Sequence, residues 1–457
     1  MSLSIKEHII YFLGIGGIGM SALARYFLSK GYQVHGYDRT TTSLTTKLEN
    51  EGMIIHYHED AKLIPAETGL VIYTPAIPAI NTELQYLQKS GVRMMKRAEV
   101  LGMLSSEYQT IACAGTHGKT TTSSMVSYLM EQSHVGCQAF LGGISRNFDS
   151  NLMISETSPF MVVEADEYDR SFLHLHPFIA IITSIDSDHL DIYKNLASVH
   201  EAFSSFTGNI VASGSLIIKQ GLDLPLQIPY GCKVYRYSVN EEADFYASNL
   251  TLEDHLYHFD FNYPKGKINN LVLGIPGLYN VENAVAALAA AILAGVTPEE
   301  LSLGLSTFKG VKRRFDIRFN EKNLVYIDDY AHHPEEIKAC ISSARAMFPN
   351  SKLTGIFQPH LFSRTRDFAS EFAKSLSLLD EVLLLQIYPA RELPIPGIDS
   401  QMLLGLMNHS NKHLVEKADI PEYFKGKHTE VLITMGAGDI DTLVEPIENF
   451  FRTNKNS

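Results

Sequence analysis

Paired cysteines and long apolar runs are both missing from this chain. Its 457 residues include four cysteines, at positions 113, 137, 232 and 340, and no C-x-x-C pair. This argues against a thiolate zinc site and suits a reducing compartment. No apolar run approaches the roughly 20 residues that a membrane-spanning helix needs, and the longest, residues 284–295, is predicted to be a buried helix. The first residues lack a secretory signal pattern, so we expect a cytoplasmic protein with no membrane insertion.

Positive charge is also in short supply. The chain has 38 lysines and arginines against 51 aspartates and glutamates, a formal net charge of -13. Such a balance argues against nucleic acid as a partner, so any anionic ligand must be held by local groups of cations. The hydrophobic share of 45% is ordinary for globular proteins, and the length predicts two or three domains with separate cores.

The functional interpretation depends most on residues 110–122, which read T-I-A-C-A-G-T-H-G-K-T-T-T. An apolar strand, a glycine turn and Gly118-Lys119-Thr120 are typical of a phosphate-binding loop, in which backbone N–H groups and lysine hold phosphate and a threonine hydroxyl binds Mg²⁺. A helix is predicted at residues 120–130, and its dipole would add to the anion site. Cys113 stands where the usual pattern has its first glycine, and Gly115 offers a turn instead.

A second glycine loop lies near the amino end, between a predicted strand and a predicted helix. Gly14, Gly16 and Gly19 have G-x-G-x-x-G spacing, and Asp38 follows where a dinucleotide fold places its ribose-binding acid. The glycines let a diphosphate approach whatever is attached to it, so the spacing alone leaves NAD open. Strands are predicted at residues 9–13, 33–37, 70–74 and 92–95, and helices at residues 18–30, 81–89 and 98–104.

Two predicted strands of the middle third end in metal-ligand residues. The strand at residues 161–163 precedes Glu164, and the strand at residues 179–183 precedes Asp186-x-Asp188-His189. The carboxyl ends of parallel strands meet at one edge of a sheet, beside a phosphate loop, and hard oxygen donors suit Mg²⁺. Glu164 and His189 are therefore candidate metal ligands.

Local patterns then predict two further features. Alternating aromatic residues at 250–263 predict one half-buried strand. Asn280 and Asn283 precede an apolar stretch at residues 284–293, where they are candidate helix caps.

The last third predicts another α/β domain. A basic segment at residues 310–316 is predicted to be a hinge, and polar residues again follow apolar strands. Strands are predicted at residues 324–327, 353–357, 382–385 and 431–435, and helices at residues 298–307 and 335–347. The polar groups that follow these strands include Asp329, His333, His360 and Arg364.

Taken in order, the phosphate loop, E-A-D-E, D-x-D-H-L-D, Y-N-V-E-N-A, R-R-F-D, D-D-Y-A-H-H-P and Q-P-H resemble the Mur ligase family along the whole chain. The resemblance implies three α/β domains: a Rossmann-like UDP-binding domain (1–107), a P-loop ATPase domain with a mostly parallel sheet (108–316) and a Rossmann-like amino-acid domain (317–457). It implies an ATP- and Mg²⁺-dependent ligase of peptidoglycan precursor synthesis. The pattern is most similar to the member that joins L-alanine to UDP-N-acetylmuramate, and the runner-up attaches an intact tripeptide. We expect a monomer or weak homodimer.

The resemblance also implies roles for single residues. Lys119 and Arg314 would contact the phosphates, and Asp329 would bind the ATP ribose. Thr120, Glu164 and His189 would hold magnesium. The other expected ATP contacts are Gly115, Thr116, His117, Gly118, Thr121, Asn280 and Asn283. The UDP-sugar would be bound by Gly14, Gly16, Gly17, Gly19, Asp38, Thr74 and Ala76, and the alanine and muramoyl carboxylates would face His333, His360 and Arg364.

One position departs from the family pattern, and three questions stay open. Leu361 follows Q-P-H where the similar member has arginine, which leaves Arg364 or Arg366 to hold the amino-acid carboxylate. His333 or His360 could accept a proton from the amine, or each could serve as a hydrogen-bonding ligand. Two other classes compete with the ligase: a nicotinamide-dependent oxidoreductase that uses the first glycine loop, and a nucleotide sensor without ligase activity.

Overall fold

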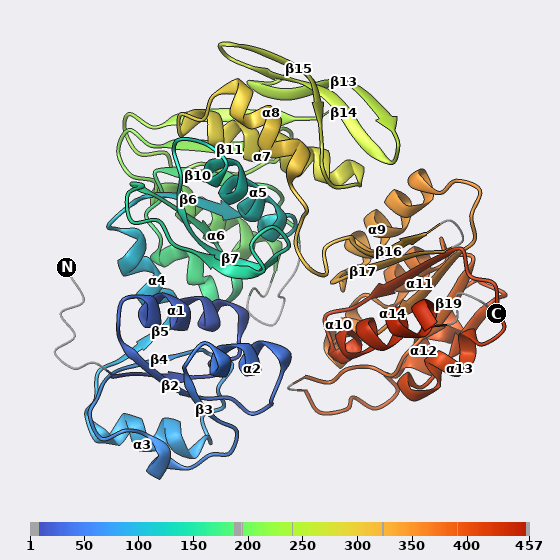
Figure 1. Ribbon diagram of the computed structural model, residues 1–457, viewed down its shortest axis with the longest axis horizontal. Helices are drawn as coiled ribbons and strands as arrows, with labels where there is room; N and C mark the ends of the chain where they lie inside the picture. Colours follow the sequence, from blue (N-terminus) through green and yellow to red (C-terminus); the bar gives the residue numbers. More distant parts are fainter. Residues whose placement is uncertain are drawn as a thin grey trace. The chain divides into compact units, whose positions relative to one another are not determined.

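The computed structural model describes residues 9–186, 193, 195–239, 241–321, 324–390 and 392–453. The chain divides into two compact units. Unit 1 comprises Met1–Thr251, His258–Gly274 and Val281–Lys309, and unit 2 comprises Leu252–Tyr257, Ile275–Asn280 and Gly310–Ser457. Three sheets make up the fold, which confirms the predicted α/β class (Figure 1).

The first sheet of unit 1 has five parallel strands in the order β3-β2-β1-β4-β5. Its strands are β1 (Ile9–Leu13), β2 (Gln33–Tyr37), β3 (Ile54–His56), β4 (Thr68–Tyr73) and β5 (Met94–Lys96). The helices that accompany them are α1 (Ile18–Ser29), α2 (Ser43–Asn50), α3 (Thr82–Ser90) and α4 (Arg97–Ser105). Strands β1 and β2 have the predicted bounds. This layout brings the first glycine loop, which follows β1, to the carboxyl edge of the sheet.

The second sheet has ten strands. Its seven middle strands, β13, β12, β11, β10, β6, β9 and β7 in spatial order, are parallel to one another, and β6 leads into the phosphate loop. Its order is β15-β14-β13-β12-β11-β10-β6-β9-β7-β8. The strands are β6 (Gln109–Ala114), β7 (Gln138–Ser145), β8 (Ser150–Met153), β9 (Phe160–Glu164), β10 (Ile179–Ile182), β11 (Ser215–Lys219), β12 (Lys233–Ser238), β13 (Phe245–Glu253), β14 (Leu256–Tyr263) and β15 (Gly266–Val272). The helical elements are α5 (Lys119–Glu131), η2 (Tyr168–His174), α6 (Leu196–Gly208), α7 (Leu278–Leu293) and α8 (Pro298–Thr307).

Two local predictions about this part of the chain are wrong. Residues 250–263 are not one strand, because Asp254 and His255 have positive φ and form a turn between β13 and β14. Asn280 and Asn283 do not cap a helix that starts at residue 284. Helix α7 already begins at Leu278, directly after the positive-φ turn at Gly277, so both asparagines lie inside it.

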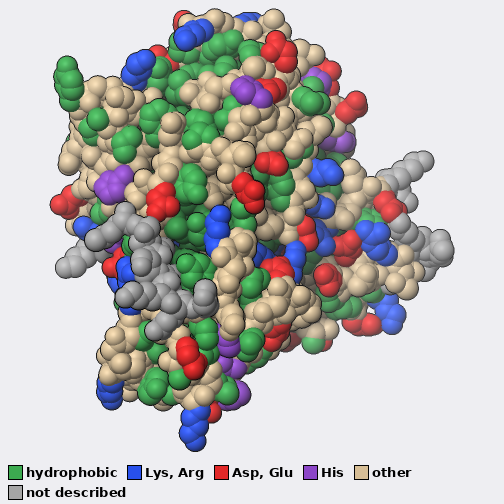
Figure 2. All heavy atoms as spheres, turned by 60° about the vertical axis from the view of Figure 1, so that its left-hand side comes forward, with side chains coloured by type: hydrophobic (Ala, Val, Ile, Leu, Met, Phe, Trp, Pro, Cys, Tyr) green, Lys and Arg blue, Asp and Glu red, His purple; other side chains and the backbone are tan. Residues whose placement is uncertain are grey.

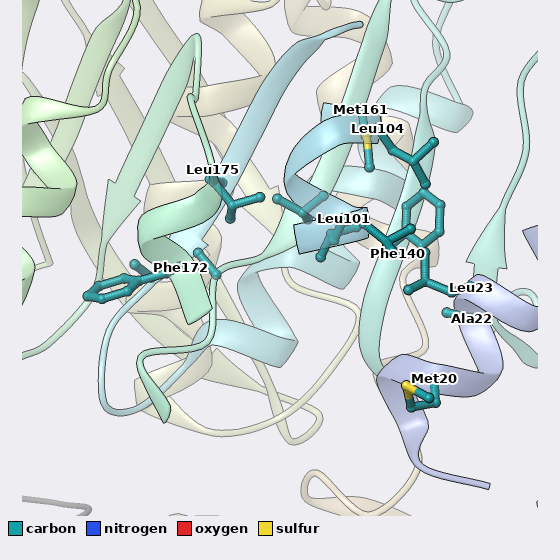
Figure 3. Packing of buried hydrophobic residues seen from close by; sticks show 14 of the residues in the cluster. Met20, Ala22, Leu23, Leu101, Leu104, Phe140, Met161, Phe172 and Leu175 are labelled. Carbon is teal, nitrogen blue, oxygen red and sulfur yellow. The ribbon is translucent and has the colours of Figure 1, made fainter. Parts of the chain in front are cut away.

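The first two sheets share one hydrophobic core. Met20, Ala22 and Leu23 on α1 and Leu101 and Leu104 on α4 belong to the same cluster of buried residues as Phe140, Met161, Phe172 and Leu175 of the second sheet and its η2 segment (Figure 3). A fragment ending near residue 107 would expose the α1 and α4 side chains of this core. The glycine loop and the phosphate loop are therefore parts of one packed body.

Unit 2 contains a six-stranded sheet in the order β16-β17-β21-β18-β19-β20, in which only the β16–β17 pair is antiparallel among the described residues. The strands are β16 (Asp316–Glu321), β17 (Leu324–Asp329), β18 (Leu353–Phe357), β19 (Glu381–Leu384), β20 (Lys412–Leu414) and β21 (Val431–Met435). Its helices are α9 (Pro334–Met347), α10 (Phe362–Asp367), α11 (Ala369–Leu376), α12 (Ser400–Leu406), α13 (Ile420–Phe424) and α14 (Val444–Thr453). Strand β16 was not predicted, and it takes up the last residue of the basic 310–316 segment.

The surface carries charged side chains of both signs. On the face displayed in Figure 2, lysine and arginine side chains are interspersed with aspartate and glutamate. Among the described residues, no helix is both long enough and apolar enough to cross a membrane.

Candidate active site

The phosphate loop connects β6 to α5, and two of its glycines have positive φ. Gly115 has φ +137° and Gly118, which precedes α5, has φ +83°. A β-carbon at Gly115 would lie 2.1 Å from Thr183 Oγ1, and one at Gly118 would lie 2.5 Å from Asn283 Oδ1. Strand β6 continues through Cys113, so the turn begins at Gly115, as the sequence suggested. Only glycine fits both loop positions without strain or displacement.

The exit of β10 holds the phosphate loop in place. Thr116 N–H donates to the Ser184 carbonyl (3.1 Å), and His117 N–H donates to Ser184 Oγ (2.8 Å). Asp186 N–H donates to Thr116 Oγ1 (2.8 Å), and Thr183 Oγ1 donates to the His117 carbonyl (2.5 Å). The His117 ring also lies 3.4 Å from an Asp186 oxygen. These contacts fix the loop before any ligand arrives.

Lys119 is the first residue of α5, and its side chain is 13% exposed. Its ammonium donates to the Gly115 carbonyl (2.7 Å), to the Thr116 carbonyl (3.3 Å) and to Glu167, whose two oxygens lie 2.9 and 2.8 Å away. Burial acts to lower the pKa of Lys119, but the carboxylates of residues 164–167, led by Glu167, raise it above its ordinary value. Lys119 is therefore a charged ammonium at the loop. Glu167, its main partner, was not among the predicted site residues.

Two of the three candidate magnesium ligands lie beside this loop. Glu164 ends β9, which pairs with β6, and a β-carbon at Gly142 would lie 2.1 Å from its Oε2, so glycine makes room for the carboxylate. Thr120 and Thr121 are buried in the first turn of α5. His189, the third candidate, lies outside the described residues. A carboxylate and a hydroxyl at this edge are hard donors that fit Mg²⁺.

The first glycine loop follows β1 and is held by β2 and by Asp38. Gly14 N–H donates to the Tyr37 carbonyl (2.8 Å), and Gly16 N–H donates to Asp38 Oδ2 (2.8 Å). Gly14 has φ +85°, and a β-carbon there would lie 2.9 Å from Thr74 Cγ2. The structure thus brings together the predicted sugar-nucleotide residues Gly14, Gly16, Gly17, Gly19, Asp38 and Thr74, with Ala76 close behind because its N–H donates to Thr74 Oγ1. Asp38 thus holds the loop through Gly16, a structural role in addition to the predicted ligand contact.

A cation that the sequence did not single out lies against this loop. A β-carbon at Gly19 would lie 2.7 Å from Arg97 Nη1, and Arg97 is the first residue of α4. The available signal was the Lys96-Arg97 pair at the end of β5, at the same edge of the sheet. Because the loop and Arg97 are 78 positions apart, spacing could not connect them.

In unit 2, Asp329 ends β17 and is buried. Its oxygens accept from Phe315 N–H (2.6 Å) and Ala331 N–H (2.7 Å). Burial raises the pKa of Asp329 to about 7, against the opposing effects of Arg314 and the two N–H donors. Its carboxylate thus fastens the 310–316 segment to the end of β17, a structural role beside the predicted ribose contact.

The two arginines of R-R-F-D lie over one tyrosine ring. The guanidinium carbons of Arg313 and Arg314 are 5.2 and 5.0 Å from the centre of the Tyr330 ring. Arg313 also pairs with Asp328 (3.2 Å) and donates to the Gly436 carbonyl (2.6 Å). Arg313 is therefore committed to the sheet edge, and Arg314 remains the candidate for phosphate contact.

The candidate histidines lie beyond the ends of β17 and β18. His333 precedes α9 and is buried, with its ring 4.9 Å from that of Phe368. His360 is less buried, and its ring stacks on Tyr388 with centres 5.8 Å apart. His332, whose ring centre is 6.2 Å from that of His360, joins this group. Tyr388 was missed because it follows β19, far from any predicted motif.

The basic residues after His360 differ in setting. Arg366 is exposed and pairs with its neighbour Asp367 (2.7 Å), whereas Arg364 is partly buried in α10. Leu361 is buried and has φ +71° and ψ 136°, a conformation that is unfavourable for a bulky side chain. Arg364 is thus the better candidate for a carboxylate ligand, and Leu361 marks a strained point beside it.

The two asparagines of α7 have different surroundings. Asn283 Oδ1 accepts from Thr122 Oγ1 (3.3 Å) and lies against Gly118, directly at the phosphate loop. Asn280 Nδ2 donates to the Pro276 carbonyl (2.6 Å). Asn283 is therefore placed beside bound nucleotide if the loop holds one, and Asn280 holds the turn before α7.

Three family models match the chain in sequence order. The model described as the Mur ligase family, catalytic domain, matches residues 9–109, and the Mur ligase middle domain matches residues 113–291. The Mur ligase, glutamate ligase domain, matches residues 313–438. Together they cover all three sheets.

Individual relatives are similar over almost the full length. A UDP-N-acetylmuramate–L-alanine ligase from Porphyromonas gingivalis is 48% identical, over 97% of this chain and 99% of that protein. One of the same description from Phocaeicola vulgatus is 50% identical, over 96% and 97%. The crystal structure of a UDP-N-acetylmuramate-alanine ligase from Thermotoga maritima has a TM-score of 0.84 and 28% identity, over 97% of this chain and 99% of that one. A murein peptide ligase from Psychrobacter arcticus, with a TM-score of 0.71 and 22% identity over 97% and 98%, shares the fold.

Proposed function

The chain belongs to the Mur ligase family, and on that premise we propose that it is an ATP-dependent ligase that joins L-alanine to the carboxylate of UDP-N-acetylmuramate in peptidoglycan precursor synthesis. The observation that carries this choice of substrates is the 48% identity with a ligase of that description over 97% of the chain. The phosphate loop, with Lys119 charged at its end, supports the use of ATP.

The reaction needs activation, because a carboxylate is a poor electrophile. In the proposed path a muramoyl carboxylate oxygen attacks the γ-phosphorus of ATP, and the bond to the β-phosphate oxygen breaks to release ADP. The amine of alanine then attacks the carbonyl carbon of the acyl phosphate. Inorganic phosphate leaves, an amide forms, and the amine gives up a proton.

The residues of this chain would act mainly by holding charge. Two anions must meet in the first step, and Lys119 and Arg314 would reduce their repulsion and stabilise charge in the phosphoryl-transfer transition state. Gly115 and Gly118 let Thr183 and Asn283 pack directly against the loop, and the backbone N–H groups of the loop would bind phosphate oxygens. Asn283, which lies against Gly118, would border the nucleotide, and Asp329 would bind its ribose.

We further propose that Mg²⁺ is bound by Glu164 and Thr120, with His189 as a third ligand. The space that Gly142 leaves for the Glu164 carboxylate supports this, since a larger residue there would displace the ligand oxygen. The hydroxyl of Thr120, in the first turn of α5, would complete the part of this set that lies within the described residues. A bound Mg²⁺ would supply charge neutralisation at the phosphates.

In unit 2, Arg364 would bind the amino-acid carboxylate, and His360 would accept the proton of the amine. His360 is preferred over His333 because His333 is buried against Phe368 at the start of α9. In this assignment His333 positions the loop and the substrate. A histidine with an ordinary pKa of ~6.5 can take up a proton near neutral pH.

The decisive experiment is a comparison of acceptors. The purified chain is mixed with ATP, Mg²⁺ and UDP-N-acetylmuramate, and either L-alanine or the tripeptide L-alanyl-γ-D-glutamyl-meso-diaminopimelate is added. ADP release and the mass of the product are measured. We expect amide product with L-alanine alone. Product formed only with the tripeptide would favour the recycling ligase, and no ADP release with either would contradict ligase activity.

A further inference from the structure

The first glycine loop carries no cation of its own. Residues 14–19 read G-I-G-G-I-G, and the nearest charged side chain in sequence that contacts the loop is the Asp38 carboxylate, which accepts from Gly16 N–H. Under the proposed function this loop takes a diphosphate, which carries about two negative charges. The positive charge must come from elsewhere in the fold.

Arg97 is placed to supply it. A β-carbon at Gly19 would lie 2.7 Å from Arg97 Nη1, 3.2 Å from Cδ and 3.3 Å from Cζ, so the guanidinium packs against the last glycine of the loop. The side chain is about one-fifth exposed (21%), which leaves its edge accessible to a ligand. A guanidinium can form two parallel hydrogen bonds with phosphate oxygens.

The same guanidinium lies near the acidic segment beside the phosphate loop. Its Nη2 lies 3.7 Å from Asp166 Oδ2, and Asp166 stands between Glu164 and Glu167 in the segment beside Lys119. Asp166 is also one of the carboxylates that raise the pKa of Lys119. The Arg97–Asp166 pair is long and partly exposed, and such pairs are weak. Arg97 can therefore leave Asp166 at little cost.

The backbone around this pair is fixed. Gly102 of α4 packs on the η2 segment so closely that a β-carbon there would lie 2.5 Å from the His174 carbonyl oxygen. A second ion pair joins Lys96, the last residue of β5, to Asp169 of η2 (3.4 Å). Because α4 and η2 are packed together, the flexible Arg97 side chain is the part that can change partner.

We propose that Arg97 is a positioning residue that binds the diphosphate of the sugar nucleotide and exchanges Asp166 for it. This inference rests on the proposed function, since it takes the ligand of the glycine loop to be a UDP-sugar. Two results follow. Arg97 contributes to sugar-nucleotide affinity, and Asp166 competes with the ligand for the same guanidinium. Sugar-nucleotide binding therefore changes the charge balance at the acidic segment beside the phosphate loop.

The first test measures affinity. Titration calorimetry on the full chain gives the Kd of UDP-N-acetylmuramate, of UDP and of uridine for the unchanged protein and for Arg97→Gln, Arg97→Lys and Lys96→Gln. We expect Arg97→Gln to raise the Kd of both diphosphates about 10- to 100-fold, with Arg97→Lys in between, because a charge-assisted contact is lost. Uridine binding should not change. Lys96→Gln, which removes the neighbouring cation, should stay within about twofold.

The second test asks whether Asp166→Asn tightens or weakens the binding of UDP-N-acetylmuramate. If Asp166 competes for Arg97, Asp166→Asn should tighten UDP-N-acetylmuramate binding by about two- to fivefold, the range expected for a weak pair. In the Arg97→Gln background the same substitution should have no effect. A merely structural pair would give weaker binding in Asp166→Asn. Unfolding midpoints within a few degrees of the unchanged protein show that each variant is folded.

The outcomes separate this inference from the proposed function. An unchanged protein that makes the alanine product, with an Arg97→Gln variant that binds UDP-N-acetylmuramate equally well, would overturn the role of Arg97. Binding that is weakened or unaltered in Asp166→Asn would overturn the exchange. An unchanged protein that neither binds UDP-N-acetylmuramate nor forms product would instead contradict the proposed function.

Discussion

Two glycine turns in unit 1 each follow a buried strand and precede a helix, yet they obtain charge in different ways. The phosphate loop ends in Lys119, and its acidic neighbours are Glu164, which ends strand β9, and Glu167, which follows that strand. The first loop contains only glycine and isoleucine, and its cation, Arg97, comes from a helix 78 positions later. A loop that carries its own charge can be recognised from a dozen residues. The sequence of a loop whose cation comes from a distant element indicates only that a diphosphate can approach it.

The comparison is tested most strongly at Lys119. Replacing Lys119 with alanine removes the charge of the phosphate loop, so turnover should fall by roughly 10²-fold or more. The structure adds a complication, because Glu167 is almost fully buried and would lose its ion pair with Lys119. Loss of one member of a buried pair costs about 3–5 kcal/mol. Steady-state ADP release and urea unfolding measure the two effects.

A double variant separates catalysis from stability. Lys119→Ala with Glu167→Gln should recover most of the lost unfolding free energy, because the buried negative charge is gone. Its turnover should stay low. ADP release near the unchanged rate in either variant would remove Lys119 from the mechanism and would make the two glycine turns more alike than we propose.

Under the proposed function, unit 2 would bind a third anion, the amino-acid carboxylate, and the cation would be Arg364. Arg364 lies in α10, three residues after the strained Leu361. Arg364→Lys should raise the Michaelis constant for L-alanine about 10- to 100-fold, because an ammonium cannot form the two parallel hydrogen bonds of a guanidinium with a carboxylate. The constant for ATP should change little. A raised ATP constant with an unmoved alanine constant would place this arginine at the other substrate.

Asp329 differs from Lys119 in which effect sets its pKa. At Lys119 the neighbouring carboxylates outweigh burial and favour the charged form, whereas at Asp329 burial outweighs the neighbouring groups and favours the neutral form. Its pKa in the folded state is raised to about 7, above the ordinary value of 3.8. The folded chain therefore holds this proton more tightly than the unfolded chain. The stabilisation is fully present below pH ~4 and is lost as the pH rises through about 7.

The matched variant is Asp329→Asn, which cannot titrate. It should be less stable than the unchanged protein at pH 5. Phe315 N–H and Ala331 N–H donate to different oxygens of Asp329, and asparagine has only one acceptor oxygen. The gap should shrink by on the order of 2–3 kcal/mol between pH 5 and pH 7.5. Urea unfolding at the two pH values measures it. A gap that is constant or widens with pH would show that Asp329 is charged throughout this range.

These sites show what could be predicted from sequence. Strands β1, β2, β18 and β21 have the predicted bounds, because short apolar runs between turn residues fix their ends locally. The phosphate loop was recognisable for the same reason. Arg97 and Tyr388 were missed, because each reaches its site through the fold from a position with no motif of its own. Glu167 ends the E-A-D-E motif, but the motif does not show that its last carboxylate pairs with Lys119.

The wrong predictions also have local causes. The alternation at residues 250–263 continues on both sides of the Asp254-His255 turn, so hydropathy gave no sign of two strands. Asparagine favours helix caps, but Gly277 already starts the turn before α7, so the helix begins before Asn280. The roles of Asn280, Asn283, His333 and His360 stay predictions, because they depend on ligands that no local pattern places.

The smallest expected effect is a difference in unfolding free energy between glycine-to-alanine variants of the two turns. Gly118 has φ +83° and its added β-carbon would lie 2.5 Å from Asn283 Oδ1, whereas Gly17 has φ −63° and its nearest neighbour would lie 3.5 Å away. Gly118→Ala should therefore lower the unfolding free energy by about 1–2 kcal/mol, and Gly17→Ala should stay within about 0.5 kcal/mol. Adding Asn283→Ala to Gly118→Ala removes the steric part and leaves the backbone part. Urea unfolding of all three variants measures each contribution. Equal losses at Gly17 and Gly118 would mean that the first loop is as tightly constrained by its surroundings as the phosphate loop.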